Sequence, residues 1–155
     1  MTTLARIATF IAMAFLATNT ETGAGAAERA QLNRLDGPVA AEVLRVIDGD
    51  TIEVRAHIWL GQEVTTLVRV GGIDAPELRG KCESERAAAR RAKARIEEHI
   101  DGREVTLRDI RFEKYAGRVM SKVETEAGED LGAALTREGL VRAYGGAKRA
   151  PWCAG

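Results

Sequence analysis

The stretch VIDGDTIEVRAHIWLGQEVTTLVRVGGIDAPE, residues 46–77, decides the fold of this chain. Residues 51–60 alternate between apolar and polar side chains at roughly the period of two that a half-buried β-strand requires. A Gly-Gln turn follows, and residues 63–73 suit the next strand. Because residues 39–47 just upstream also suit a strand, residues 39–73 are predicted to form a three-stranded antiparallel meander.

The period changes downstream of the meander. Residues 83–100, ESERAAARRAKARIEEHI, are rich in helix-forming residues, and an Asp-Gly pair follows them. Apolar side chains recur in this segment at the i, i+3 and i+4 spacing of an amphipathic helix. The members of this thin apolar stripe are Ala88, Ala89, Ala92, Ile96 and Ile100.

The remaining residues predict two more strands and a second helix. Residues 103–112 and 117–126 suit strands, joined by a connection that contains EKYA. Residues 129–140 suit a short helix that starts near Glu129 or Asp130. The tail after it is predicted to be irregular.

This order of elements predicts an α+β fold that is mainly β. Three strands, a helix, two strands and a helix are compatible with a five-stranded barrel of the OB type, with one long and one short helix. A ferredoxin-like fold would need a further helix early in the chain. The 155 residues suffice for one domain with a single core, which we place at residues 39–155 after a linker at 28–38.

The N-terminus has the layout of a secretory signal. Arg6 precedes an apolar run at residues 7–17, which is too short to span a bilayer comfortably, and small residues follow it. We expect residues 1–27 to be a signal peptide, with cleavage near Ala26 or Ala27. An ordinary N-terminal helix is the alternative, but the run has no polar face. The expected location is therefore secreted or periplasmic, with no membrane contact after cleavage.

The overall charge gives no argument for a polyanionic partner. Lys and Arg together number 23, as do Asp and Glu, so the net charge is zero. A nucleic acid would have to be held by a local group of arginines.

Two carboxylates follow sharp turns in the opening stretch. Asp50 comes after the first strand of the meander and Asp74 after the third, so both side chains can reach the same edge. Two carboxylates and a backbone carbonyl make an all-oxygen site suited to Ca²⁺ or Mg²⁺. The alternative for Asp-Gly-Asp is a plain hairpin turn.

Other charged residues could complete a site for phosphodiester hydrolysis. Arg69 and Glu77 flank Asp74 closely, and the later segment EKYAGR supplies Arg118. Guanidinium groups stabilise charge on phosphoryl oxygens, and a carboxylate can align or deprotonate water. Each residue alone could instead belong to a solvated surface.

Four motifs together resemble those of the thermonuclease, or staphylococcal-nuclease-like, family. They are VIDGDTIEV, RVGGIDAPE, KYAGRV and LTREGLVRAY, and they occur in the family's order and spacing from about residue 39 to residue 144. The resemblance implies an OB-fold nuclease that hydrolyses DNA and RNA with Ca²⁺. It also implies cleavage of the P–O5′ bond, which leaves 3′-phosphates.

The resemblance also implies a role for each matching residue. Asp50, Asp74 and the carbonyl of Ala75 correspond to the calcium ligands. Glu77 corresponds to the general base, and Arg69 and Arg118 to the arginines that bind the scissile phosphate. The expected contacts to a terminal phosphate and to a base are Lys114, Tyr115 and Tyr144.

The chain departs from the family pattern at several points. Ala116 is an extra residue in KYAGR, and Gly146 replaces a second tyrosine, which weakens base stacking. The segment between Glu77 and the long helix is short, and no C-terminal helix is predicted.

The two cysteines, Cys82 and Cys153, are expected to form a disulfide. Export permits such a bond, and the chain offers neither of them another cysteine partner. The bond would tie the irregular tail back to the barrel. The alternative is two unrelated small side chains.

The sequence leaves two other functions open. A non-catalytic OB module could bind single-stranded nucleic acid or oligosaccharide, but it would need stacking aromatics, and aromatic residues make up only 5% of the chain. A structural envelope protein would rest on the signal segment alone. We expect a monomeric nuclease with DNA and RNA as substrates and no stable protein partner.

Overall fold

The computed structural model describes residues 33–100, 102–113 and 117–153. The predicted signal peptide, Lys114 and Tyr115 lie outside the described residues. Among the described residues, no helix is long and apolar enough to cross a bilayer.

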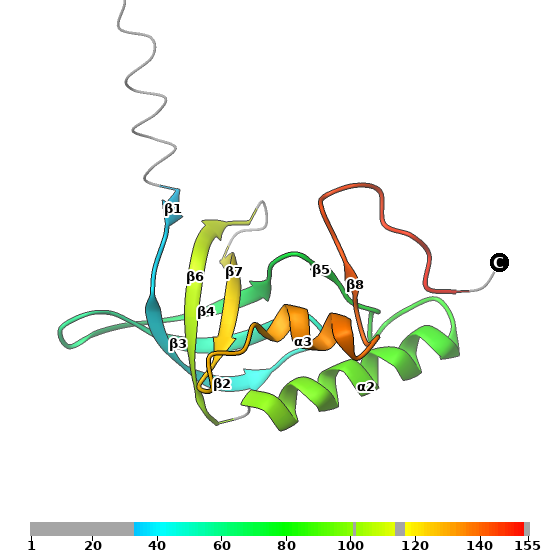
Figure 1. The fold of residues 1–155 in the computed structure, drawn as a ribbon, viewed down its shortest axis with the longest axis horizontal. Coiled ribbons are helices and arrows are strands. Elements are labelled where there is room, and N and C mark those ends of the chain that lie inside the picture. The colour runs from blue at the N-terminus through cyan, green and yellow to red at the C-terminus, as the bar shows by residue number, and fades with distance from the viewer. Residues whose placement is uncertain (1–32, 101, 114–116, 154–155) are drawn as a thin grey trace, which may run out of the picture.

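The described residues form a β-barrel with two helices packed beside it (Figure 1). The elements in chain order are β1 (Arg34–Leu35), β2 (Val39–Val46), β3 (Thr51–Trp59), β4 (Gln62–Val70), β5 (Ile73–Asp74), α2 (Glu83–Ile100), β6 (Glu104–Phe112), β7 (Arg118–Thr125), α3 (Leu131–Arg137) and β8 (Arg142–Ala143).

The barrel closes through strands that are distant in sequence. Its strands follow the order β6-β2-β3-β4-β7, and β6 and β7 also pair with each other. All neighbours are antiparallel except β4 and β7, which run parallel. The predicted α+β fold of the OB type, with one long and one short helix, is therefore confirmed.

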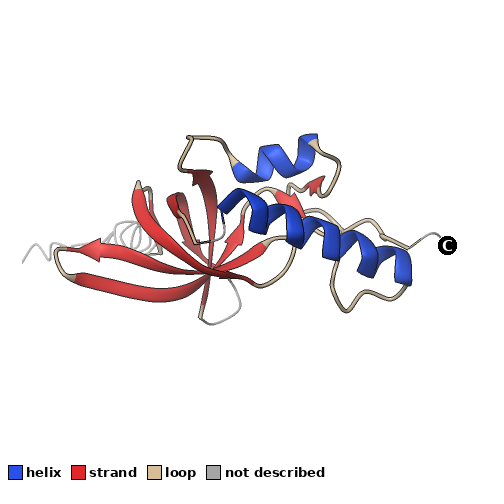
Figure 2. Ribbon diagram, turned by 90° about the horizontal axis from the view of Figure 1, so that it is seen from below, coloured by secondary structure: helices blue, strands red, loops and turns tan. Residues whose placement is uncertain are grey.

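The core fills the barrel and extends under the helices. Figure 2 shows both helices on one side of the barrel. Most of the stripe predicted for α2 is buried, because these side chains pack against the strands, whereas Ala88 is only half-buried. The largest fully buried apolar side chains include Ile52, Val54, Val68, Val70, Ile96, Ile100, Leu107, Leu131 and Leu135.

The predicted third strand was too long. It ends at Val70 because Gly72 takes a left-handed backbone conformation, with a φ of 80°, in the turn that follows. Ile73 and Asp74 form the separate strand β5 and pair with β8. The tail, which was predicted to be irregular, therefore contributes a short strand beside Asp74. At the other end of the domain, β1 lies in the predicted linker and pairs with β6.

The second helix is shorter than the sequence indicated. Asp130 is the N-cap residue, and its side chain accepts a hydrogen bond from the backbone N–H of Ala133 at 2.8 Å. The helix ends at Arg137.

Candidate functional site

A cleft of about 960 Å³ gathers most of the residues that the sequence singled out. The turn after β2, the end of β4, the loop after β5 and the start of β7 all contribute to its walls, as does the tail after β8. The polar residues that line it are Asp48, Asp50, Arg69, Glu77, Arg111, Glu113, Arg118, Tyr144 and Arg149.

The turn that carries Asp50 packs directly against the loop after β5. A side chain at Gly49 would meet the Cβ atoms of Ala75 and Ala92 at 3.1 Å each, so this position favours glycine. The backbone carbonyl of Asp50 also accepts a hydrogen bond from the N–H of Val70 at 2.8 Å. The Asp-Gly-Asp segment thus packs closely against the loop after β5, against α2 and against the end of β4, which a simple hairpin turn would not require.

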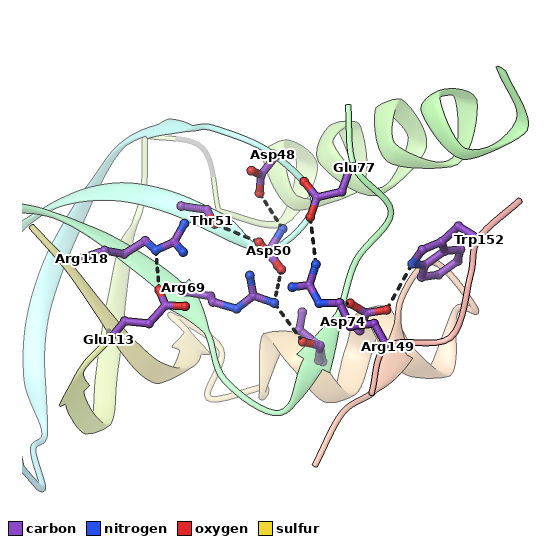
Figure 3. Close-up of polar contacts among 11 residues, drawn as sticks. Asp48, Asp50, Thr51, Arg69, Asp74, Glu77, Glu113, Arg118, Arg149 and Trp152 are labelled. Carbon is purple, nitrogen blue, oxygen red and sulfur yellow. Dashed lines mark hydrogen bonds and ion pairs between the residues drawn. The ribbon is translucent and has the colours of Figure 1, made fainter. Parts of the chain in front are cut away.

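Asp50 and Arg69 form a buried ion pair at the edge of the barrel (Figure 3). Arg69 Nη2 lies 2.7 Å from Asp50 Oδ2, and the hydroxyl of Thr51 donates to Asp50 Oδ1 at 2.8 Å. Burial raises the pKa of Asp50 to about 7, and the nearby Asp48 adds to that rise while Arg69 opposes it. The Asp50 carboxylate is therefore in an environment where further positive charge would stabilise its ionised form.

Asp74, the last residue of β5, is buried and faces the tail after β8. Trp152 Nε1–H donates to Asp74 Oδ2 at 3.1 Å. Arg149 Nε lies 2.9 Å from Asp74 Oδ1 as an ion pair, although Oδ1 accepts no well-directed hydrogen bond from the described residues. The following residue, Ala75, is also buried.

Glu77 lies at the mouth of the cleft with about half of its side chain exposed. Its Oε1 accepts a hydrogen bond from Arg149 Nη1 at 3.0 Å. The buried carboxylate of Glu85 anchors the loop between β5 and α2. It accepts hydrogen bonds from the backbone N–H groups of Glu77 at 3.4 Å and Lys81 at 3.1 Å. Glu77 is thus fixed at its backbone while its side chain faces the cleft and solvent.

The opposite wall of the cleft carries the second predicted arginine. Arg118 forms an ion pair with Glu113, which sequence reasoning did not single out. Tyr144 lines the cleft from the tail, where its backbone N–H donates to the carbonyl of Gly72 at 2.8 Å. The Arg149 guanidinium lies 6.0 Å from the centre of the Tyr144 ring.

The oxygen groups around Asp50 and Asp74 suit a hard divalent cation. Both carboxylates are buried, and Asp74 Oδ1 lacks a hydrogen bond from the described residues. Carboxylate and carbonyl oxygens are the ligands that Ca²⁺ prefers. A second group, Cys82, Glu85 and Cys153, is compact but is not a metal centre, because its two sulfurs are bonded to each other and offer no thiolate.

A known protein family matches more than half of the chain. The profile described as staphylococcal nuclease homologue matches residues 67–151, which include Arg69, Asp74, Glu77 and Arg118. This chain belongs to the staphylococcal nuclease homologue family. No curated protein matches it significantly.

The match to the nuclease homologue family begins inside β4, so Asp50 lies upstream of it. Asp50 joins the site through its ion pair with Arg69. Strand register favours this pair, because Thr51, the residue after Asp50, lies opposite Arg69. The structure thus brings together Asp50, Arg69, Asp74, Glu77, Arg118 and Tyr144, while Lys114 and Tyr115 lie outside the described residues.

Sequence reasoning did not predict four contacts that surround the candidate site. Arg149 and Trp152 contact Asp74, Glu85 holds the Glu77 loop, and Glu113 pairs with Arg118. One signal could have pointed to the tail: the expected disulfide, which the structure contains between Cys82 and Cys153, brings Trp152 back to the barrel.

Proposed function

We propose that this member of the family is an exported, Ca²⁺-dependent nuclease that hydrolyses phosphodiester bonds of DNA and RNA and leaves 3′-phosphates. One observation carries the proposal: two arginines, Arg69 and Arg118, share a cleft with the carboxylates of Asp50 and Glu77. The buried Asp74 adjoins this cleft, because Arg149 bridges it to Glu77. The family match supports nuclease chemistry.

The cation would be held by Asp50, Asp74 and the carbonyl of Ala75. When bound, Ca²⁺ supplies Lewis-acid polarisation of the phosphate and charge neutralisation among the carboxylates. The raised pKa of Asp50 supports this assignment, because burial makes its negative charge costly and a cation would offset that cost. Asp74 Oδ1 accepts no well-directed hydrogen bond from the described residues, and Arg149 supplies its nearby positive charge.

The side chains of this chain carry the remaining steps. Arg69 and Arg118 bind the scissile phosphate and stabilise the charge that builds on its oxygens in the transition state. Glu77 accepts a proton from the attacking water, whose oxygen bonds to phosphorus while the P–O5′ bond breaks. The leaving 5′-oxygen takes up a proton, and the phosphate stays on the 3′-oxygen.

Further contacts would align the nucleic acid strand. We assign the contact with a base to Tyr144, and the contacts with a terminal phosphate to Lys114 and Tyr115. We also propose that the protein acts as a monomer without a stable protein partner, in the periplasm or outside the cell.

Hydrolysis of single-stranded DNA and RNA by the purified mature protein tests the proposal. We expect cleavage with Ca²⁺, no cleavage in EGTA, and products that carry 3′-phosphates and 5′-hydroxyls. Products with 5′-phosphates, or full activity in chelator, would contradict it. Binding of the nucleic acid without cleavage under all metal conditions would instead identify a non-catalytic OB module.

A further inference from the structure

The tail after β8 covers the carboxylates of the proposed metal site. Arg149 bridges Asp74 and Glu77, with Nε 2.9 Å from Asp74 Oδ1 and Nη1 3.0 Å from Glu77 Oε1. Trp152 donates to the other oxygen of Asp74 at 3.1 Å. Figure 3 shows the Arg149 guanidinium between the two carboxylates. Both oxygens of Asp74 are therefore engaged by the tail.

The charge balance explains why Arg149 takes this position. Arg69 is already paired with Asp50, so Asp74 and Glu77 draw positive charge from another element. Partial burial lowers the pKa of Arg149, but the hydrogen bond to Glu77 and the charges of Asp74, Glu77 and Asp50 outweigh this effect and give a net rise. Arg149 thus pairs with Asp74, a carboxylate that the divalent cation would need, and with Glu77, the proposed general base.

The segment that carries Arg149 is held at both ends. At its start, the segment is held by the antiparallel backbone pairing of β8 with β5, in which Arg142 lies opposite Asp74. At its end, Cys153 is bonded to Cys82 just before α2. Figure 1 shows this segment, in red, arching from β8 back toward the first turn of α2.

Internal contacts also shape the segment. The Arg142 guanidinium lies 3.8 Å from the centre of the Trp152 ring, and its Nη1 donates to the carbonyls of Ala150 at 3.3 Å and Pro151 at 3.1 Å. Because the ends are fixed, the guanidinium of Arg149 remains near the carboxylates at a high effective concentration.

We propose that Arg149 is a tethered counter-cation of the metal site, which a divalent cation must displace from Asp74 in order to bind. The inference rests on the proposed function, since it takes the site to bind Ca²⁺. It assigns to Arg149 the control of cation affinity, and to the Cys82–Cys153 disulfide the control of how strongly Arg149 competes.

Calorimetric titration with Ca²⁺ at fixed pH and ionic strength tests the first part. Arg149→Gln should tighten Ca²⁺ binding by roughly fivefold to tenfold, because the competing charge is lost. Lys148→Gln is the matched control: it removes the same charge one residue away, from an exposed side chain that forms no ion pair with the described residues. Its effect on affinity should stay below about twofold, as expected for a screened exposed charge. Equal or weaker Ca²⁺ binding by Arg149→Gln would overturn the proposal.

A double-mutant cycle tests the tether. Replacing both cysteines by serine should tighten Ca²⁺ binding when Arg149 is present and leave the affinity unchanged in the Arg149→Gln background. Weaker Ca²⁺ binding in both backgrounds would show that the tail only supports Asp74, which would overturn the role of the tether. Circular dichroism of each variant checks that the fold is retained.

Thermal melting in EGTA gives a readout that does not depend on Ca²⁺. Without a cation, Arg149→Gln should melt at a lower temperature than the wild type, because Asp74 and Glu77 lose their counter-charge, whereas Lys148→Gln should not. An unchanged melting temperature for Arg149→Gln would contradict the counter-cation role. Failure of the wild type and every variant to bind Ca²⁺ would instead overturn the proposed function, and the inference with it.

Discussion

Two arginine–carboxylate groups face the same cleft, and they are built differently. In the barrel, Arg69 and Asp50 form a pair whose side chains are 10% and 8% exposed. On the tail, the Arg149 side chain is 42% exposed and pairs with Glu77, which is 55% exposed, and with Asp74, which is 4% exposed. The first pair is fixed by strand register, since Arg69 lies opposite Thr51 on β3. The second joins residues that are 72 positions apart.

The difference indicates that one site combines a buried pair with a pair whose guanidinium is open to solvent. Breaking a buried pair leaves an uncompensated charge in the interior, which is strongly destabilising. In the tail group the guanidinium is open to solvent, so it can leave the carboxylates when a competing cation takes its place. We therefore expect the barrel pair to persist during function and the tail pair to exchange, and four measurements test this contrast.

The largest expected effect is a loss of stability when the disulfide that anchors the tail is removed. Cys82→Ser/Cys153→Ser should lower the free energy of unfolding by about 4 kcal/mol, since the bond joins residues separated by 71 positions. Urea unfolding of the oxidised protein and the variant measures this loss, with circular dichroism to confirm that the barrel remains folded. Equal stability would mean that the tail is held without the bond.

The second-largest expected effect is a pH dependence of stability, which arises from Asp50 of the barrel pair. Burial raises the pKa of Asp50 to about 7, so between pH 4 and pH 7 the folded protein holds a proton that the unfolded chain has lost. Stability should therefore fall as pH rises through this window, by about 3 kcal/mol between pH 5 and pH 8.

Urea unfolding in EGTA at these two pH values measures the effect. Asp50→Asn should flatten the dependence, whereas Asp36→Asn, at an exposed acid away from the cleft, should keep it. An unchanged slope in Asp50→Asn would assign the titration to another group.

Catalysis is expected to depend on residues from both groups and on Arg118. Arg69→Ala, Arg118→Ala and Glu77→Gln should each lower kcat/KM for single-stranded DNA by about a hundredfold, because each loses one preorganised contact to the transition state. Combined substitutions should be non-additive. Arg108→Ala is the matched control, since Arg108 pairs with Glu124 at 2.8 Å and does not line the cleft. Near wild-type turnover in any of the three variants would refute its assigned role.

The smallest expected effect concerns the support of Asp74 by the tail. Trp152→Phe removes the N–H that donates to Asp74 and should lower stability by about 1 kcal/mol in EGTA. Trp59→Phe, at a side chain that is 76% exposed on the β3–β4 hairpin, should change it far less. Equal losses in the two variants would indicate that the indole hydrogen bond adds nothing to the tail.

Much of the barrel could be predicted because its signals are local. Alternation predicted β3, residue preferences predicted β2, the helical spacing predicted the whole of α2, and the four motifs led to the family. The prediction was wrong for the end of the third strand and for the tail. Both errors have one cause: β5 and β8 are two-residue strands that exist because they pair with each other. Strands this short carry no periodic signal.

The sequence by itself determined the strands of the barrel, the long helix and the residue types of the candidate site, because strand alternation, helix spacing and turn residues act over short distances. The tertiary structure alone decided how those residues are paired. It placed Asp50 against Arg69 in the interior, and Arg149 and Trp152 over Asp74. These contacts depend on burial and on the closure of a loop by the disulfide, and both arise only when segments far apart in the chain pack together.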